Sequence, residues 1–121
     1  MQKQKKMNCH VLVVDCEEDS RRFMAKIIGS LVQEVSQVAD AEGCLQAVRQ
    51  LQPDIVVLNV GVGLIRSLIK VIGESSVSCR TLAVVSFWDE ADEVAGADGV
   101  LAKPIMKKDL LGLLKQLQPG Q

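Results

Sequence analysis

The sequence predicts an α/β domain in which a parallel β-sheet is covered by helices on both faces. Short apolar runs rich in β-branched residues alternate with amphipathic segments, in β-α order, five times along the chain. The runs are continuously apolar, as in strands that are buried on both faces. With 121 residues and 48% apolar composition, the chain has enough material for one core. We therefore expect a single domain over residues 1–121.

The elements follow from these patterns in order. Strands are predicted over residues 10–15, 34–38, 55–59, 81–86 and 99–102. Helices are predicted after a cap at Asp19 or Ser20 and over residues 41–51, 64–72, 88–94 and 105–117. Phe23, Ile27, Ile28 and Leu31 are expected on the buried face of the first helix. The fourth helix is short because Gly96 follows it closely, and the basic residues 1–8 are expected to be a frayed end.

Composition narrows the function classes. The formal net charge is −1, which points neither to nucleic acid nor to an anionic membrane. No apolar run approaches the roughly 20 residues of a membrane helix, and no export signal begins the chain, so we expect a cytoplasmic protein. The four cysteines form no CxxC pair, and the single histidine has no partner at ligand spacing. Zinc and disulfide frameworks are therefore disfavoured.

Polar side chains end four of the predicted strands. Asp15 ends the first strand, Asn59 the third and Ser86 the fourth, while Lys103-Pro104 follows the fifth. Because parallel strands of a doubly wound sheet end at one edge, we expect an acid, an amide, a hydroxyl and an ammonium group to converge there. That edge is where α/β proteins place their functional sites.

Four stretches of the chain carry a resemblance to a known family. They are Val-Leu-Val-Val-Asp15 followed by Arg21-Arg22, Gln52-Pro53-Asp54 leading to Asn59, Leu82-Ala-Val-Val-Ser86, and Ala95-Gly96-Ala97-Asp98-Gly99 followed by Lys103-Pro104. Over residues 11–117 the chain resembles the receiver domain of two-component response regulators. The resemblance implies a flavodoxin-like fold with strand order 2-1-3-4-5 and a shortened fourth helix. It also implies a site for Mg²⁺-assisted phosphoryl transfer to a carboxylate.

The chain departs from that family at its reactive positions. Asn59 stands at the phospho-acceptor position, and an amide lacks the carboxylate nucleophile. Cys16 stands where the second metal-binding acid should be, which leaves Asp15 as a vestige of the metal site. Mg²⁺ prefers carboxylate and water oxygens, so its binding is predicted to be weak or absent. Val100 stands at the aromatic switch position, whereas Ser86, Lys103 and Pro104 are retained.

The resemblance and these departures together predict a pseudo-receiver. We expect no enzymatic activity and no cofactor, and a signalling or regulatory protein as the partner of a phosphorylation-independent interaction module. An alternative is a sensor that binds a small anion, a metabolite or an oxidant at the degenerate site, through Cys16 and Lys103. An enzyme of unrelated chemistry has the least support, because no Ser-His-Asp set and no phosphate-binding glycine-rich loop is present.

Two interpretations stay open for each polar residue of the degenerate site. Lys103 either neutralises Asp15, which we favour, or binds an anion. Asn59 is expected to hydrogen-bond both Asp15 and Lys103, leaving the pocket closed without metal. Cys16 is either an inert buried thiol, which we favour because acidic neighbours surround it, or a thiolate activated by Lys103.

Candidate interface residues lie in the last third of the chain. At least one of the rings of Phe87 and Trp88 is expected to fill the core under the short fourth helix, and the alternative is an exposed anchor for a partner. The last helix carries Leu110, Leu111 and Leu114 in an apolar band wider than one buried face requires. That band predicts either an association surface, such as a homodimer through the fourth and fifth helix region, or an unusually hydrophobic helix of a monomer.

Overall fold

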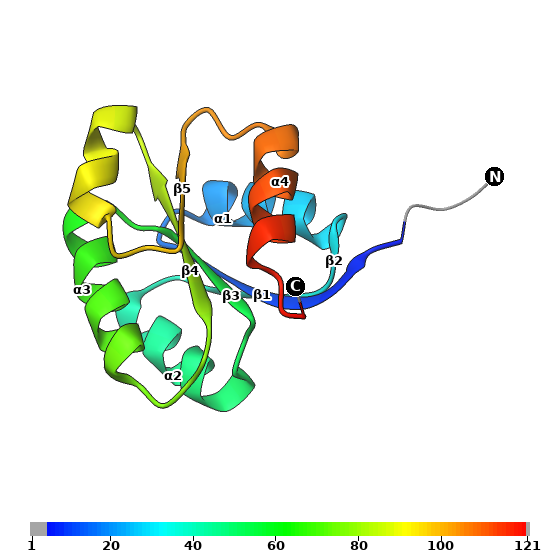
Figure 1. The fold of residues 1–121 in the computed structure, drawn as a ribbon, viewed down its shortest axis with the longest axis horizontal. Coiled ribbons are helices and arrows are strands. Elements are labelled where there is room, and N and C mark those ends of the chain that lie inside the picture. The colour runs from blue at the N-terminus through cyan, green and yellow to red at the C-terminus, as the bar shows by residue number, and fades with distance from the viewer. Residues whose placement is uncertain (1–4, 121) are drawn as a thin grey trace.

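The computed structural model describes residues 5–120 as one five-stranded parallel sheet with the order β2-β1-β3-β4-β5 (Figure 1). The strands are β1 Met7–Asp15, β2 Val32–Val38, β3 Ile55–Asn59, β4 Arg80–Val85 and β5 Gly99–Ala102. The helices are α1 Glu18–Gly29, α2 Ala41–Leu51, α3 Val62–Glu74, the 3₁₀ helix η1 Trp88–Val94 and α4 Lys107–Leu117. The predicted fold class and strand order are confirmed. Among the described residues, no helix has the length and apolar character that a membrane crossing requires.

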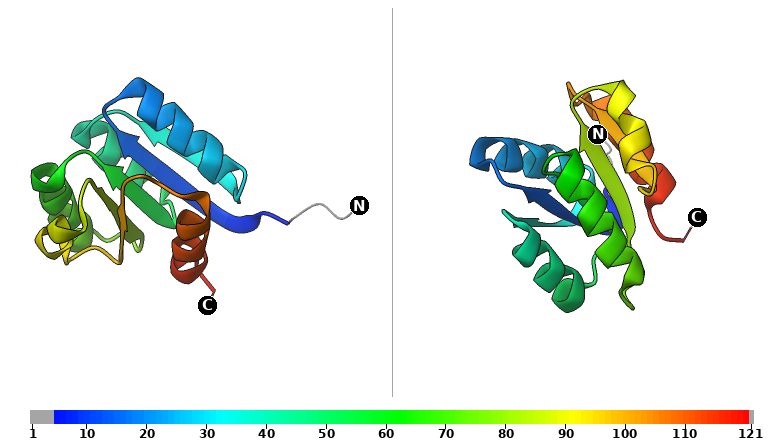
Figure 2. Two further views of the ribbon diagram at one scale, coloured as in Figure 1. Left: turned by 90° about the horizontal axis from the view of Figure 1, so that it is seen from above. Right: turned by 90° about the vertical axis from the view of Figure 1, so that its left-hand side faces the viewer.

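Helices cover both faces of the sheet (Figure 2), and one apolar core lies on each face. One core holds the inward residues of α1 and α4, with Met24, Ile28, Leu110 and Leu114 packed against odd-numbered residues of β1 and β3. The other holds inward residues of α2, α3 and η1, packed against the even-numbered residues of the same strands. This period-2 division between faces explains why the strands read as continuous apolar runs.

The register of the central strands sets the position of the candidate site. Asp15 of β1 lies directly beside Asn59 of β3, because the two strands pair in parallel with matched C-terminal ends. β4 and β5 continue the sheet on the side of β3 away from β1. The polar residues that end these strands therefore share one edge of the sheet, as expected.

The first strand begins earlier than the sequence suggests. Met7 and Asn8 were expected in a frayed tail, and that prediction is wrong for both, because β1 begins at Met7. The Met7 N–H donates to the Leu31 carbonyl at 2.9 Å, and the side chain packs against the core of α1 and α4. The rest of the expected tail includes residues 1–4, which lie outside the described residues.

The buried face of α1 is rotated from the one predicted. Phe23 is 59% exposed, whereas Met24 is buried together with Ile28. The helix also begins at Glu18, so neither Asp19 nor Ser20 is its cap. The physical reason lies in the first turn, where Ser20 and Arg21 bond back to Asp15 and set the rotation of the helix.

The region around the short fourth helix differs most from expectation. Phe87 and Trp88 are 69% and 66% exposed, so the prediction that a ring fills the core is wrong. Val94, at the end of η1, is buried in that core instead. The apolar band of α4 also turns inward, but into the other core, the one that α4 shares with α1: Leu110 and Leu114 are fully buried there, and Leu111 is half-buried against it. Leu110 and Leu114 therefore cannot supply an exposed interface.

Candidate functional site

Asp15 and Asn59 form a closed hydrogen-bonded pair at the ends of β1 and β3. Both side chains are buried, at 2% and 8% exposure. The Asn59 Nδ2 group donates to Asp15 Oδ2 at 3.0 Å and to Ser20 Oγ at 3.3 Å. Facing a carboxylate, an amide presents its NH₂ end, because only that end donates. The predicted bond from Asn59 to Asp15 is confirmed.

The remaining acceptor capacity of Asp15 is used by its own chain neighbourhood. The Ser20 hydroxyl donates to Oδ2 at 2.5 Å, and the Glu17 backbone N–H donates to Oδ1 at 3.0 Å. Arg21 adds a bond from its Nη1 to the Asp15 carbonyl oxygen at 2.9 Å. Among the described residues, every buried side-chain nitrogen and oxygen atom has a hydrogen-bond partner. The buried charge of Asp15 is thus stabilised by hydrogen-bond donors rather than by a paired cation.

Sequence reasoning missed the role of Ser20 and Arg21 in this site. Ser20 lies five residues after Asp15, in the first turn of α1, where a short hydroxyl side chain can reach back to the end of β1. The signal was present in the spacing, but a serine near a helix start is more commonly a cap. Only the observed start of α1 at Glu18 distinguishes the two roles.

The residues at this corner do not fit Mg²⁺. Asp15 is the single carboxylate in the buried pair, and both of its oxygens already accept hydrogen bonds. Asn59 turns a donor toward Asp15, although a metal would need acceptors. Over residues 5–120, no group of three or more His, Cys, Asp and Glu side chains is placed to hold a metal ion.

Cys16 lies outside the closed pair. Its side chain is exposed, so the favoured interpretation as a buried thiol is wrong. The residue follows the last position of β1, where the chain leaves the sheet before α1 begins. Cys9 and Cys44 are buried, whereas Cys79 is only partly buried.

Burial controls the ionisation of the other thiols. Desolvation, aided by the charge of Asp54, raises the pKa of Cys9 to about 11. Desolvation, with a smaller contribution from the neighbouring Cys79, raises the pKa of Cys44 to about 11. Burial also raises the pKa of Cys79, with Asp98 adding to the shift. These three thiols are held in their protonated, unreactive form at neutral pH.

Ser86 and Lys103 form a second, open half of the site. Both side chains are exposed at the ends of β4 and β5. Glu90 of η1 accepts the backbone N–H groups of Ser86 and Phe87 through its Oε1, each at 3.0 Å. Ser86, Glu90 and Lys103 line a hollow of about 80 Å³ that also touches Asn59. The Lys103 N–H donates to the Val85 carbonyl at 2.9 Å, and a cis peptide bond joins Lys103 to Pro104.

The predicted ion pair between Lys103 and Asp15 does not form. Within the described residues, Arg22 forms an ion pair with Glu18 and the His10 ring lies 3.7 Å from the Glu34 carboxylate, and neither contact involves the site. Since Asp15 is satisfied by neutral donors and by the peptide N–H of Glu17, it does not need the lysine. The structure also shows no bond from Asn59 to Lys103 within residues 5–120, so the prediction that the amide bridges both partners is wrong for Lys103.

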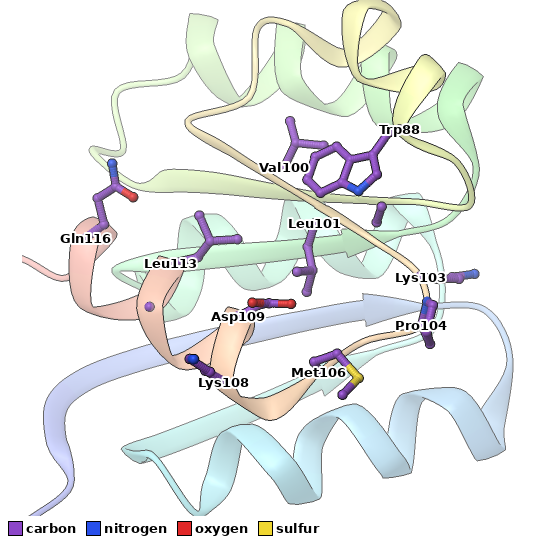
Figure 3. Close-up of a pocket in the computed structure, with 12 residues that line it drawn as sticks. Trp88, Val100, Leu101, Lys103, Pro104, Met106, Lys108, Asp109, Leu113 and Gln116 are labelled. Carbon is purple, nitrogen blue, oxygen red and sulfur yellow. The ribbon is translucent and has the colours of Figure 1, made fainter.

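A larger groove lies beside the open half. It has a volume of about 650 Å³ and is lined by Trp88, by three residues of β5 and by one side of α4 with its preceding segment. Val100, at the predicted aromatic switch position, lies in its wall and is half-buried (Figure 3). Figure 3 also places Lys103 and Pro104 at one end of the groove, with the lysine side chain directed away from it.

Comparison with solved structures identifies receiver domains as structural neighbours. The receiver domain (CheY-like) from Methylobacillus flagellatus matches with 18% identity and a TM-score of 0.79, over 92% of this chain and 99% of that one. The signal receiver domain from Bermanella marisrubri matches with 20% identity and a TM-score of 0.77, over 92% and 98%. A receiver-modulated diguanylate cyclase from Pelobacter carbinolicus matches with 20% identity and a TM-score of 0.75, over 89% and 90%.

At sequence identities of 18–20%, these matches show only that the fold is shared. No protein-family model and no curated protein sequence matches the chain. The structural neighbours confirm the receiver fold that the strand-end motifs predicted.

Proposed function

We propose that this chain is a pseudo-receiver, a signalling module that binds a partner protein without being phosphorylated. The observation that carries the proposal is the hydrogen bond from Asn59 Nδ2 to Asp15 Oδ2 at 3.0 Å. It joins the phospho-acceptor position to the last acid of the metal site, and it turns both inward. A module with this closed pair presents one fixed surface rather than two switched ones.

The chemistry of the pair supports this function over phosphoryl transfer. Forming an acyl phosphate requires a carboxylate nucleophile, and Asn59 has none. A metal ion would also have to displace the Ser20 and Asn59 donors from Asp15, and it would gain only one carboxylate in exchange. Each displaced donor would then be left without its partner, which costs free energy in a buried site.

The exposed surface of the chain supports protein binding. Phe87, Trp88 and Met106 are large apolar side chains with exposed fractions of 69%, 66% and 57%. Trp88 and Met106 both line the 650 Å³ groove next to β5. Exposed tryptophan beside a groove is typical of interface anchors. The proposed binding surface comprises η1, β5 and α4, with Trp88 as anchor in place of the buried leucines.

The test is incubation with beryllofluoride and Mg²⁺, followed by amide NMR spectra. The expected result is unchanged amide signals at Asn59, Ser86 and Lys103, because the closed pair leaves no acceptor. A receiver domain with an aspartate acceptor, treated in the same buffer, serves as the positive control. A saturable shift of the Ser86 and Lys103 signals would disprove phosphorylation independence.

A second candidate is a sensor of small anions or oxidants, and the exposure of Cys16 is the observation that favours it. The 80 Å³ hollow at Ser86 and Lys103 offers a place for an anion, although Cys16 does not line it. Peroxide treatment of the native chain and of Cys16→Ser, followed by thermal unfolding, separates the two candidates. A melting temperature that responds to peroxide only in the native chain, or that rises with anions in both, would favour the sensor.

A further inference from the structure

The groove beside β5 follows the free edge of the sheet. β5 pairs with β4 alone, so one side of its backbone has no strand partner within the described residues. Three consecutive residues of β5, Val100, Leu101 and Ala102, line the groove. Successive residues of a strand point to opposite faces of the sheet. A hollow that touches all three must therefore run along the edge of the strand, where unpaired N–H and C=O groups lie.

The two walls of the groove come from opposite faces of the sheet. Trp88 stands beside Val100 on the η1 side, while Met106, Asp109 and Leu113 stand on the α4 side (Figure 3). One position of the α4 wall has no side chain. Gly112 lines the groove, and a Cβ atom added to it would meet no other atom within 4 Å. The edge of β5 is thus flanked by Trp88 on one side and by Met106 and Leu113 on the other, and it is open between them.

We infer that this groove binds an extended segment of a partner protein, which adds to the sheet as a sixth strand beside β5. An added strand would supply the hydrogen bonds that the edge lacks, and its alternating side chains would reach both walls. A helix in the same groove would contact the walls but leave the backbone groups of β5 unpaired. The inference rests on the proposed function, because it names the class of segment that the interaction module binds.

The charges on the two faces specify that segment further. η1 has the sequence WDEADEV, in which Asp89, Asp92 and Glu93 are exposed acids, whereas Glu90 accepts hydrogen bonds from the Ser86 and Phe87 backbone. On the other face, α4 begins with Lys107 and Lys108, and Lys108 lines the groove together with the acid Asp109. Because a strand directs alternate side chains to opposite faces, the segment should carry basic residues in one row and acidic residues in the other.

The same charges argue against a second copy of this chain as the occupant. An antiparallel pairing of two β5 strands would continue one sheet through both copies. Elements on the same face would then become neighbours, η1 next to η1 and α4 next to α4, since η1 and α4 cover opposite faces. The acidic helices would repel each other, and so would the lysines of α4.

Trp88 makes the inference directly measurable. It is the single tryptophan of the chain, which has no tyrosine, so intrinsic fluorescence reports on this wall of the groove. The probe is a capped synthetic peptide with the order lysine, glutamate, valine, valine, lysine, glutamate. The expected result is a saturable change in Trp88 emission, with a dissociation constant of about 1 mM or below, together with NMR shifts of the Val100 and Ala102 amides.

Two further peptides test the backbone and the charges separately. Replacing both valines by proline removes two N–H donors, and binding should weaken roughly tenfold. Replacing both lysines by glutamate places acids toward η1, and binding should weaken roughly fivefold. Equal binding of the proline peptide would overturn strand addition, and equal binding of the all-acidic peptide would overturn the charge pattern.

A pair of matched variants locates the binding site. Gly112→Gln puts a long side chain into the groove, whereas Gly73→Gln makes the same change on α3, at a position equally free of neighbours. Only Gly112→Gln should abolish peptide binding. Binding that survives in Gly112→Gln, or no binding by the native chain, would overturn the inference. Dimerisation in sedimentation that Gly112→Gln abolishes would assign the groove to a second copy and overturn it too.

These outcomes are independent of the test of the proposed function. The peptide titrations contain neither Mg²⁺ nor a phosphoryl analogue. If the chain responds to beryllofluoride and also binds the peptide, only phosphorylation independence is overturned. If it neither responds to beryllofluoride nor binds the peptide, only strand addition is overturned.

Discussion

The two halves of the candidate site, at the C-terminal ends of the strands, differ in burial and in hydrogen bonding. On one side, Asp15 and Asn59 are buried and tied together, with Ser20 closing the network. On the other side, Ser86 and Lys103 are exposed, and Lys103 forms no ion pair within residues 5–120. The difference teaches that a buried acid needs hydrogen-bond donors around it when no cation is paired with it. Exposed polar groups need no protein partner, because water supplies their hydrogen bonds.

The largest expected effect on stability comes from removing the hydrogen-bond acceptor of the closed Asp15–Asn59 pair. Asp15→Ala should lower the free energy of unfolding by about 3 kcal/mol, because it leaves the Ser20, Asn59 and Glu17 donors without their acceptor. Lys103→Met is the matched change in the open half and should leave that free energy unchanged. Urea unfolding of both variants checks the contrast. An equal loss in the two would show that Lys103 does stabilise the buried carboxylate.

Asn59→Asp tests whether the closed half can be returned to phosphoryl chemistry. A second carboxylate against Asp15 Oδ2 replaces a donor with a like charge, so unfolding should become about 2 kcal/mol easier at pH 7. The loss should shrink as the pH falls, because protonating one carboxyl removes the repulsion. Intact-mass measurement after acetyl phosphate and Mg²⁺ should find no covalent phosphate, since Cys16 supplies no second acid. A phosphorylated variant would show that one carboxylate pair suffices.

The stability of the fold at alkaline pH tests the burial of the Cys9 and Cys44 thiols, with the exposed Cys16 as the comparison. The pKa values of Cys9 and Cys44 are raised to about 11, from an ordinary 9.0 in the unfolded chain. Stability from these protonated thiols is therefore complete below pH 9 and is lost as the pH rises from 9 toward 11. The expected loss is about 1 kcal/mol for each thiol by pH 10. Cys16 is exposed when folded, so Cys16→Ser should show the same loss.

The smallest effect compares two serines at the ends of strands. Ser20→Ala removes one of the donors to Asp15 and should cost about 1 kcal/mol of stability. Ser86→Ala removes an exposed hydroxyl and should cost nothing measurable. Thermal unfolding monitored by circular dichroism separates the two. If Ser86→Ala were the more damaging change, the open half would have a structural role that its exposure does not suggest.

Local patterns in the sequence determined the fold and the location of the site. The alternation of apolar runs with amphipathic segments predicted all five strands, and the resemblance to receiver domains implied their order. Helices and strands can be predicted in this way because the spacing of apolar residues along a short segment is visible in the sequence itself. The positions of Asp15 and Asn59 at one edge followed as well, because parallel strands share their C-terminal edge.

The tertiary structure alone decided which side chains face inward and which partners they meet. The leucine band of α4 is compatible with several rotations of the helix, and packing against β1 and β3 selected the one that buries Leu110 and Leu114. Phe87 and Trp88 remained outside because Val94 occupies the core under η1. Asp15 took Ser20 and Asn59 as partners rather than Lys103, because those donors lie within bonding distance while the lysine stays in solvent. Such choices depend on distances between segments far apart in the chain, and periodicity contains no information about them.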